Sequence, residues 1–234
     1  MSIVQEGGPA FDPALMRRAA YGLAIAGVVV GAATLFAPSA PLAALDIVLA
    51  LASAAMIVPA PELFEISGRR KTRGMNPLFA IPAGLVFVAG VTNDFVAISP
   101  LVIAAAAGAL AALGAGLTTW RRPGISGPWQ FLILMGLIGA AIGYGGVALI
   151  DLRFDASPEQ PFRTAVASMT VSHGRGVSYY LHLAPWGPVP HESRVTVSKS
   201  LYDRFNPGDQ ACIGLRNGAL AIPWYVVRVC PGPA

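Results

Sequence analysis

Hydrophobic residues in the first 150 positions of the chain come in blocks of about twenty, separated by short polar or Pro-containing segments. A helix of about 20 apolar residues crosses the hydrocarbon core of a bilayer. The pattern therefore predicts five transmembrane helices, at residues 19–37, 42–60, 78–97, 101–119 and 130–150. The chain is expected to consist of an N-terminal cytoplasmic arm (1–18), a helical membrane bundle (19–150) and a C-terminal domain (151–234).

The C-terminal domain alternates polar and apolar residues in short runs, which is typical of β-strands. Candidate strands cover residues 164–172, 176–184, 193–198, 210–216 and 219–229. A Gly-rich turn at His173-Gly174-Arg175 predicts one hairpin, and Asn217-Gly218 predicts a second with a two-residue turn. We expect a small all-β domain: an SH3-like barrel, an OB-like barrel or a sandwich.

Basic residues of the membrane half gather in three segments. They are Arg17, Arg18, Arg69, Arg70, Lys71, Arg73, Arg121 and Arg122. With five helices all three segments lie on one side of the membrane, whereas the opposite loops, 38–41 and 98–100, contain no Lys or Arg. Loops rich in Lys and Arg stay in the cytoplasm. The N-terminus is therefore predicted inside and the C-terminal domain outside. The clusters at 69–73 and 121–122 can also bind anionic lipid.

The first hydrophobic block has a second interpretation as a cleaved signal peptide, because Pro38-Ser39-Ala40 resembles a cleavage site. The acidic Glu6 and Asp12 in the leading segment disfavour it, and so does Pro41, which would directly follow the cut. An uncleaved anchor is predicted. Arg outnumbers Lys fourteen to two, a bias of GC-rich bacterial genomes, so the expected location is a bacterial inner membrane with a periplasmic C-terminal domain.

Small residues recur every four positions in three of the predicted helices. They are Gly27, Gly31, Ala104, Gly108, Ala112, Gly116, Gly139 and Gly143. Faces of this kind let helix backbones approach closely in lipid. Two interpretations remain: packing within this bundle, or docking of a second copy or of a partner subunit.

Two acidic residues, Asp46 and Asp94, fall within predicted helices. An acid inside a bilayer is a functional hypothesis by default, here a proton or ion relay. Both lie within about five residues of the predicted external helix ends, so an interfacial acid in contact with water is the alternative.

The two cysteines, Cys212 and Cys230, lie in the predicted periplasmic domain, where a disulfide is allowed. A two-residue turn at 217–218 would place Cys212 opposite Pro223, about 23 Å from Cys230. A bridge then requires the tail to bend or a barrel to close. A disulfide and two separate thiols both stay open.

His173, His182 and His191 are nine residues apart, without the close spacing of a zinc site, so no metal ligands are predicted. Trp186, Trp224 and Tyr225 stand in Pro-containing segments and are candidates for a partner-binding surface or for contact with lipid headgroups.

Only 12% of the residues are charged and 55% are hydrophobic, against about 25% charged in soluble domains. No basic stripe with interleaved aromatic residues indicates a nucleic-acid partner. No nucleophile elbow or phosphate-binding loop indicates catalysis or a cofactor. The leading hypothesis is a non-enzymatic membrane protein whose bundle anchors a domain that contacts another membrane or periplasmic protein. The alternatives are a small ion- or proton-coupled transporter using Asp46 and Asp94, and a membrane enzyme with a periplasmic histidine-based metal site.

Overall fold

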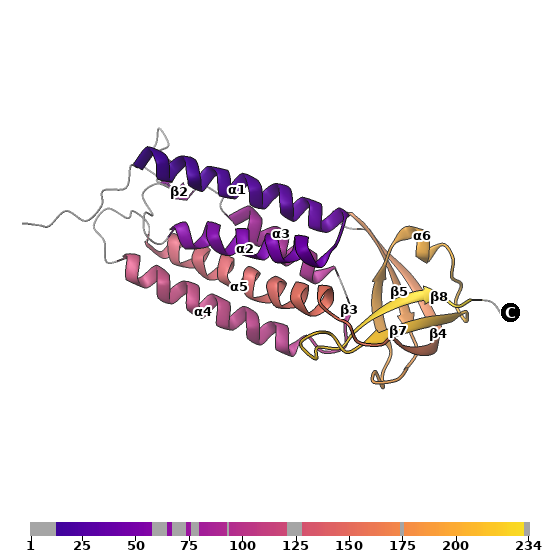
Figure 1. Cartoon of the computed structure of the whole chain (residues 1–234). Coiled ribbons are helices and arrows are strands. Elements are labelled where there is room, and N and C mark those ends of the chain that lie inside the picture. Colours follow the sequence, from indigo (N-terminus) through magenta and orange to yellow (C-terminus); the bar gives the residue numbers. More distant parts are fainter. Residues whose placement is uncertain are drawn as a thin grey trace, which may run out of the picture. The chain divides into compact units, whose positions relative to one another are not determined.

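A computed structural model describes residues 13–57, 65–66, 74–75, 80–92, 94–120, 128–173 and 176–231. It divides into two compact units (Figure 1). The helical unit consists of Met1–Gly90 and Leu101–Leu149, and the β unit consists of Val91–Pro100 and Ile150–Ala234. The sequence indicated a boundary near residue 150, but not that residues 91–100 belong to the C-terminal unit.

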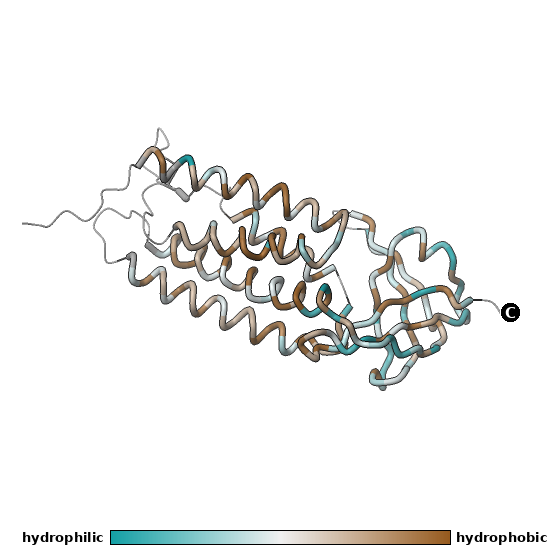
Figure 2. The backbone as a smooth tube through the Cα atoms, in the orientation of Figure 1, coloured by the Kyte–Doolittle hydropathy of each residue, from teal (hydrophilic) through white to brown (hydrophobic). Residues whose placement is uncertain are grey.

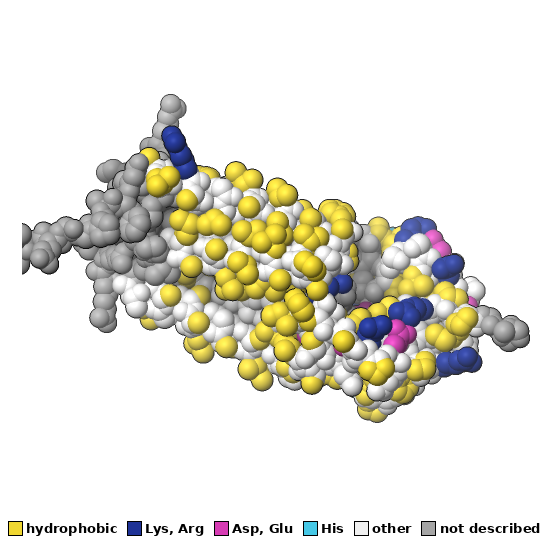
Figure 3. Space-filling model, in the orientation of Figure 1, with side chains coloured by type: hydrophobic (Ala, Val, Ile, Leu, Met, Phe, Trp, Pro, Cys, Tyr) yellow, Lys and Arg dark blue, Asp and Glu magenta, His cyan; other side chains and the backbone are white. Residues whose placement is uncertain are grey.

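The apolar blocks form helices. They are α1 (Pro13–Phe36), α2 (Ala40–Ile57), α3 (Ile81–Val91), α4 (Ser99–Trp120) and α5 (Pro128–Arg153). Among the described residues, three segments are long and apolar enough to cross a membrane: Arg18–Phe36, Ser99–Thr118 and Phe131–Arg153. The apolar helices at 40–56 and 81–91 are shorter. Hydrophobic residues follow one another along these helices, and the visible face of the helical unit is largely hydrophobic (Figures 2 and 3).

The prediction of one helix over residues 78–97 is wrong in its second half. Helix α3 ends at Val91, and Asp94–Phe95 forms strand β3. At 1.5 Å per residue α3 is about 16 Å long, shorter than the hydrocarbon core. Pro82 falls in its first turn, where proline fits without a kink. Near the N-terminus, helix α1 begins at Pro13, inside the segment 1–18 that was predicted to be a cytoplasmic arm.

The predicted small residues lie at helix contacts within the helical unit. A Cβ on Gly139 of α5 would meet the backbone of Gly108 and come within 2.6 Å of the Ala112 Cβ, both on α4. Likewise Gly143 faces the Ala104 carbonyl, and a Cβ on Gly116 would come within 3.0 Å of Leu132. On α1, Cβ atoms at Gly27 and Gly31 would each come within 2.8 Å of α3, at Pro82 and Leu85 respectively. These small side chains therefore permit close packing inside the bundle.

The β unit is a nearly closed antiparallel barrel, which confirms the predicted all-β domain at that level. Its strands are β3, β4 (Gln160–His173), β5 (Val177–Leu183), β6 (Ser193–Val197), β7 (Gln210–Arg216) and β8 (Trp224–Val229). The strand order is β3-β8-β7-β4-β5-β6. The long β4 pairs with β7 through its first half and with β5 through its second, with a register shift between Val166 and Ser168. Helix α6 (Lys199–Tyr202) follows β6 and is capped by Ser198, whose hydroxyl accepts a 3.3 Å hydrogen bond from the Leu201 N–H. A separate pair, β1 (Glu65–Ile66) and β2 (Gly74–Met75), belongs to the helical unit.

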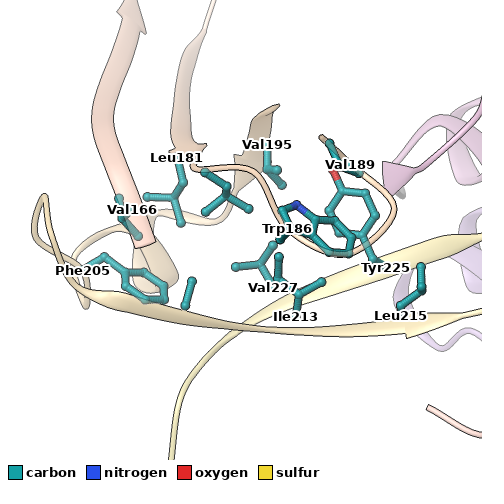
Figure 4. Packing of buried hydrophobic residues seen from close by; sticks show 12 residues of the cluster. Val166, Leu181, Trp186, Val189, Val195, Phe205, Ile213, Leu215, Tyr225 and Val227 are labelled. Atoms are coloured by element: carbon teal, nitrogen blue, oxygen red, sulfur yellow. The ribbon is translucent and has the colours of Figure 1, made fainter. Parts of the chain in front are cut away.

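Buried side chains from every long strand fill the barrel (Figure 4). Trp186 and Tyr225 meet edge to face with ring centroids 5.0 Å apart, and Phe162 lies 5.8 Å from Trp186. Both Trp186 and Tyr225 belong to this core rather than to an exposed surface, with 5% and 8% of their area accessible. The segment after β5 folds back over the barrel because Trp186 and Val189 exchange two backbone hydrogen bonds of 2.9 and 2.7 Å.

The hairpin of β7 and β8 differs from the one expected. Cys212 pairs with Arg228 and Arg216 with Trp224, so the loop comprises residues 217–223 instead of two residues. The predicted separation of Cys212 and Cys230 is therefore wrong. Cys230 lies two residues beyond the partner of Cys212, and the structure joins the two cysteines in a disulfide with a Cα–Cα distance of 4.9 Å.

Candidate functional site

The barrel has a seam between the outer edges of β8 and β6. Strand β3 pairs with β8 only at Trp224 and Tyr225, and the rest of that edge of β8 has no strand partner in the described part of the chain. Strand β6 is the last strand of the sheet on the other side. A cavity of about 200 Å³ lies in the seam. It is lined by residues 195–198 of β6 and the following turn, 225–227 of β8, Leu201, Thr92 and Asp94.

Asp94 lies at the start of β3, opposite Tyr225. Burial raises the pKa of Asp94 to about 6. No hydrogen bond or ion pair to its carboxyl group occurs among the residues that the structure describes. Burial, together with the neighbouring Asp94 charge, also raises the pKa of Tyr225. The seam thus holds a poorly solvated acid beside a phenol, an environment that favours a positively charged ligand group.

A second hollow, of about 520 Å³, lies over β4, β7 and β8 and is lined by residues that include Phe162, Arg163 and Cys212. Two of its charged side chains, Glu159 and Arg228, pair with each other, and the third, Arg163, is exposed. Arg228 donates two hydrogen bonds to Glu159, of 2.9 and 3.2 Å, and the Arg216 guanidinium lies 3.6 Å from the same carboxylate. The Glu159 carboxylate is therefore neutralised by arginines within the barrel.

The long β7–β8 loop is held by Asp151 at the end of α5. The Asp151 carboxylate accepts hydrogen bonds from the backbone N–H groups of Leu220 (2.7 Å) and Ile222 (3.4 Å), and its carbonyl accepts one from Ala219 (3.0 Å). Gly218, with φ +75°, lies so close that a Cβ there would meet the carboxylate. Asp151 was not singled out from the sequence, where it read as the polar end of an apolar block.

Asp155 supports the same hairpin. Its carboxylate accepts a 2.9 Å hydrogen bond from the Trp224 indole and a 2.7 Å bond from the Ser157 N–H. Partial burial acts to raise the pKa of Asp155, but these hydrogen bonds outweigh it and lower the pKa. Trp224 is therefore a half-buried structural side chain, with the Arg216 guanidinium 5.8 Å from its ring centre.

Asp46 is the other buried acid that the sequence indicated. It lies on α2 in the helical unit and is completely buried, and neither carboxyl oxygen has a hydrogen-bond partner in the structure described. A Cβ on Gly31 would come within 3.1 Å of its Oδ1 atom. Asp46 and Asp94 belong to different units.

The histidines do not converge. His182 lies 3.1 Å from the Thr170 hydroxyl and 3.2 Å from Glu192. Within the described ranges, no three His, Cys, Asp or Glu side chains are arranged to hold a metal ion. The basic clusters at 69–73 and 121–122 lie outside the described residues.

Comparison of the chain with protein-family models, with curated proteins and with solved structures found no match.

Proposed function

We propose that this is a bacterial inner-membrane protein whose helices anchor a disulfide-bonded β-barrel in the periplasm, where the barrel binds another envelope protein. The pairing of β3 with β8 is the observation that carries this proposal. Strand β3 lies between α3 and α4, and the other barrel strands follow α5. The chain therefore leaves the barrel through α4 and returns to it through α5.

Helices α4 and α5 each contain a segment long and apolar enough to cross a bilayer. Two crossings place the connection between them, with Arg121 and Arg122, on the membrane face opposite the barrel. Because arginine-rich loops stay in the cytoplasm, this connectivity supports a periplasmic barrel whatever the number of other crossings. The Cys212–Cys230 disulfide suits the same oxidising compartment.

The partner-binding part of the proposal is tested by cross-linking intact cells, solubilising the membranes in mild detergent and purifying the tagged chain. We expect one envelope protein at a constant ratio to the chain, and we expect the purified partner to bind again to the purified chain. Recovery of the chain alone, neither self-associated nor bound to a partner, would refute an interaction subunit.

A second candidate function, ion or proton coupling in the bundle, is favoured by Asp46 alone. A fully buried carboxylate without a partner costs several kcal/mol unless a proton or cation compensates its charge. Proteoliposomes that contain the chain should then show a cation or proton flux that Asp46→Asn abolishes. Ser53→Ala, a change at another buried polar residue of α2, should leave the flux unchanged. Equal flux in wild type and Asp46→Asn would exclude this function.

A further inference from the structure

The seam between β8 and β6 exposes two strand edges that face one cavity. In an antiparallel sheet the backbone groups of alternate residues point to the same edge. The Val96 N–H donates to the Pro223 carbonyl at 2.8 Å, so the backbone groups of Pro223 point towards the β3 side. Those of Tyr225, Val227 and Val229 then point the same way. Strand β3 begins at Asp94, opposite Tyr225, so the edge of β8 at Val227 and Val229 has no strand beside it in the described part of the chain.

The strand directions leave one consistent arrangement for an added strand. Neighbouring strands from β8 through β7, β4 and β5 to β6 are all antiparallel, so β8 and β6 run in the same direction. A segment placed between them runs antiparallel to both, as β3 already does with β8. Such a segment would continue the line of β3 and close the barrel.

The charge of the cavity lining indicates which side chains the added segment carries. Asp94 lies at the end of the open edge, half-buried, and in the described structure no cationic side chain pairs with it. The nearby basic residue of α6, Lys199, is bound to Asp203 by a 2.6 Å ion pair. The remaining polar lining consists of hydroxyl-bearing residues such as Thr196 and Ser198, and the rest is mostly apolar. A Lys or Arg side chain on an otherwise uncharged strand matches this lining.

We propose that the seam binds an extended segment of the partner protein as an added β-strand, with a basic side chain of that segment paired with Asp94. The inference rests on the proposed function, since it names the barrel surface and the chemistry of the partner. Backbone hydrogen bonds to the edge at Val227 and Val229 supply much of the affinity, and Asp94 supplies the preference for a cation.

The experiment measures binding of the acetylated and amidated peptide Thr-Val-Thr-Arg-Thr-Val-Thr to the full chain in detergent micelles, by fluorescence anisotropy of a labelled peptide. The neutral control replaces its Arg by citrulline, which keeps the shape and removes the charge. We expect the Arg peptide to bind with a Kd below 1 mM. The citrulline peptide should bind at least tenfold more weakly, and methylation of alternate backbone nitrogens of the Arg peptide should abolish binding.

The matched protein variants are Asp94→Asn and Glu192→Gln, the second an exposed acid elsewhere in the barrel. Asp94→Asn should weaken binding of the Arg peptide at least tenfold, and Glu192→Gln should leave this binding unchanged. Melting curves of the same samples show whether both variants are folded. No binding at 1 mM, equal binding of the citrulline peptide, or unchanged binding by Asp94→Asn would overturn the inference. If the natural partner still co-purifies in that case, the proposed function stands and only the seam is excluded.

Discussion

Burial of Asp94 disfavours the ionised form of its carboxyl group. Because burial raises its pKa from 3.8 to about 6, the folded chain binds more protons than the unfolded chain between these values. The contribution of Asp94 to the free energy of unfolding therefore falls as the pH rises from about 4 to 6 and stays low above that.

Asp94→Asn removes this penalty. We expect the variant to be more stable than wild type by about 2–3 kcal/mol at pH 8, with a smaller difference at pH 5. Thermal melting followed by tryptophan fluorescence at the two pH values measures it. A variant less stable than wild type at pH 8 would show that the carboxylate makes favourable contacts instead.

Glycines of the β unit give a graded test of the β7–β8 loop. Gly218 has a positive φ and faces Asp151, Gly208 has a positive φ with open space around it, and Gly176 has neither constraint. We expect substitution by Ala to lower the free energy of unfolding by at least about 2 kcal/mol at Gly218, by about 1 kcal/mol at Gly208 and by less than about 0.5 kcal/mol at Gly176. Equal melting temperatures for the three variants would contradict the role of Asp151 in holding the loop.

Individual side chains were harder to assign from the sequence than their elements. Proline-containing segments around Trp186 and Trp224 suggested exposed aromatic side chains, yet Trp186 lies in the core and Trp224 hydrogen-bonds Asp155. A buried aromatic residue in a loop has no periodic pattern to reveal it. Only the folding-back of the loop, with its two backbone hydrogen bonds between Trp186 and Val189, brings the indole inside.

At the scale of elements, α4 and α5 approach through glycine. Replacing Gly139 by Leu forces atoms into the backbone of Gly108, which cannot move as a flexible side chain can. We expect a loss of at least about 2 kcal/mol in stability. The control is Gly114→Leu on α4, where a Cβ meets nothing within 4 Å. If both variants melt at the wild-type temperature in detergent, the close contact of the two helices is wrong.

The disulfide between β7 and the residue after β8 closes a short loop. Removing it with the pair Cys212→Ser and Cys230→Ser should lower stability by about 3 kcal/mol, mainly through greater freedom of the unfolded chain. A reducing agent should bring wild type down to the same melting temperature and leave the double variant unchanged. Wild type that is insensitive to reduction would contradict a stabilising bridge.

The β7–β8 hairpin also marks the limit of local sequence signals. Asn217-Gly218 is a strong signal for a two-residue turn, but Asp151 binds the backbone of the following residues and draws the loop out to residue 223. That contact spans about seventy positions of the chain, beyond the reach of any turn pattern. The alternation of the strands themselves was sufficient to predict β4 to β8, with their ends shifted by a few residues.

For the whole molecule, hydropathy predicted a helical part followed by an all-β part, and the structure has long apolar helices and a nearly closed barrel in the C-terminal part of the chain. The two-residue strand β3 was not predicted, because a strand this short carries no alternation and here follows an apolar block. Its pairing with β8 makes the connection between α3 and α4 part of the C-terminal unit.

The side of the membrane occupied by the barrel is the claim on which the partner and disulfide arguments depend. It is measured most directly with alkaline phosphatase and green fluorescent protein fused in parallel after Ala234, with matched truncations fused after Gly124, between α4 and α5. A periplasmic barrel should give active phosphatase and no fluorescence at Ala234, and the reverse at Gly124. Fluorescence with inactive phosphatase at Ala234 would place the barrel in the cytoplasm and exclude a periplasmic location.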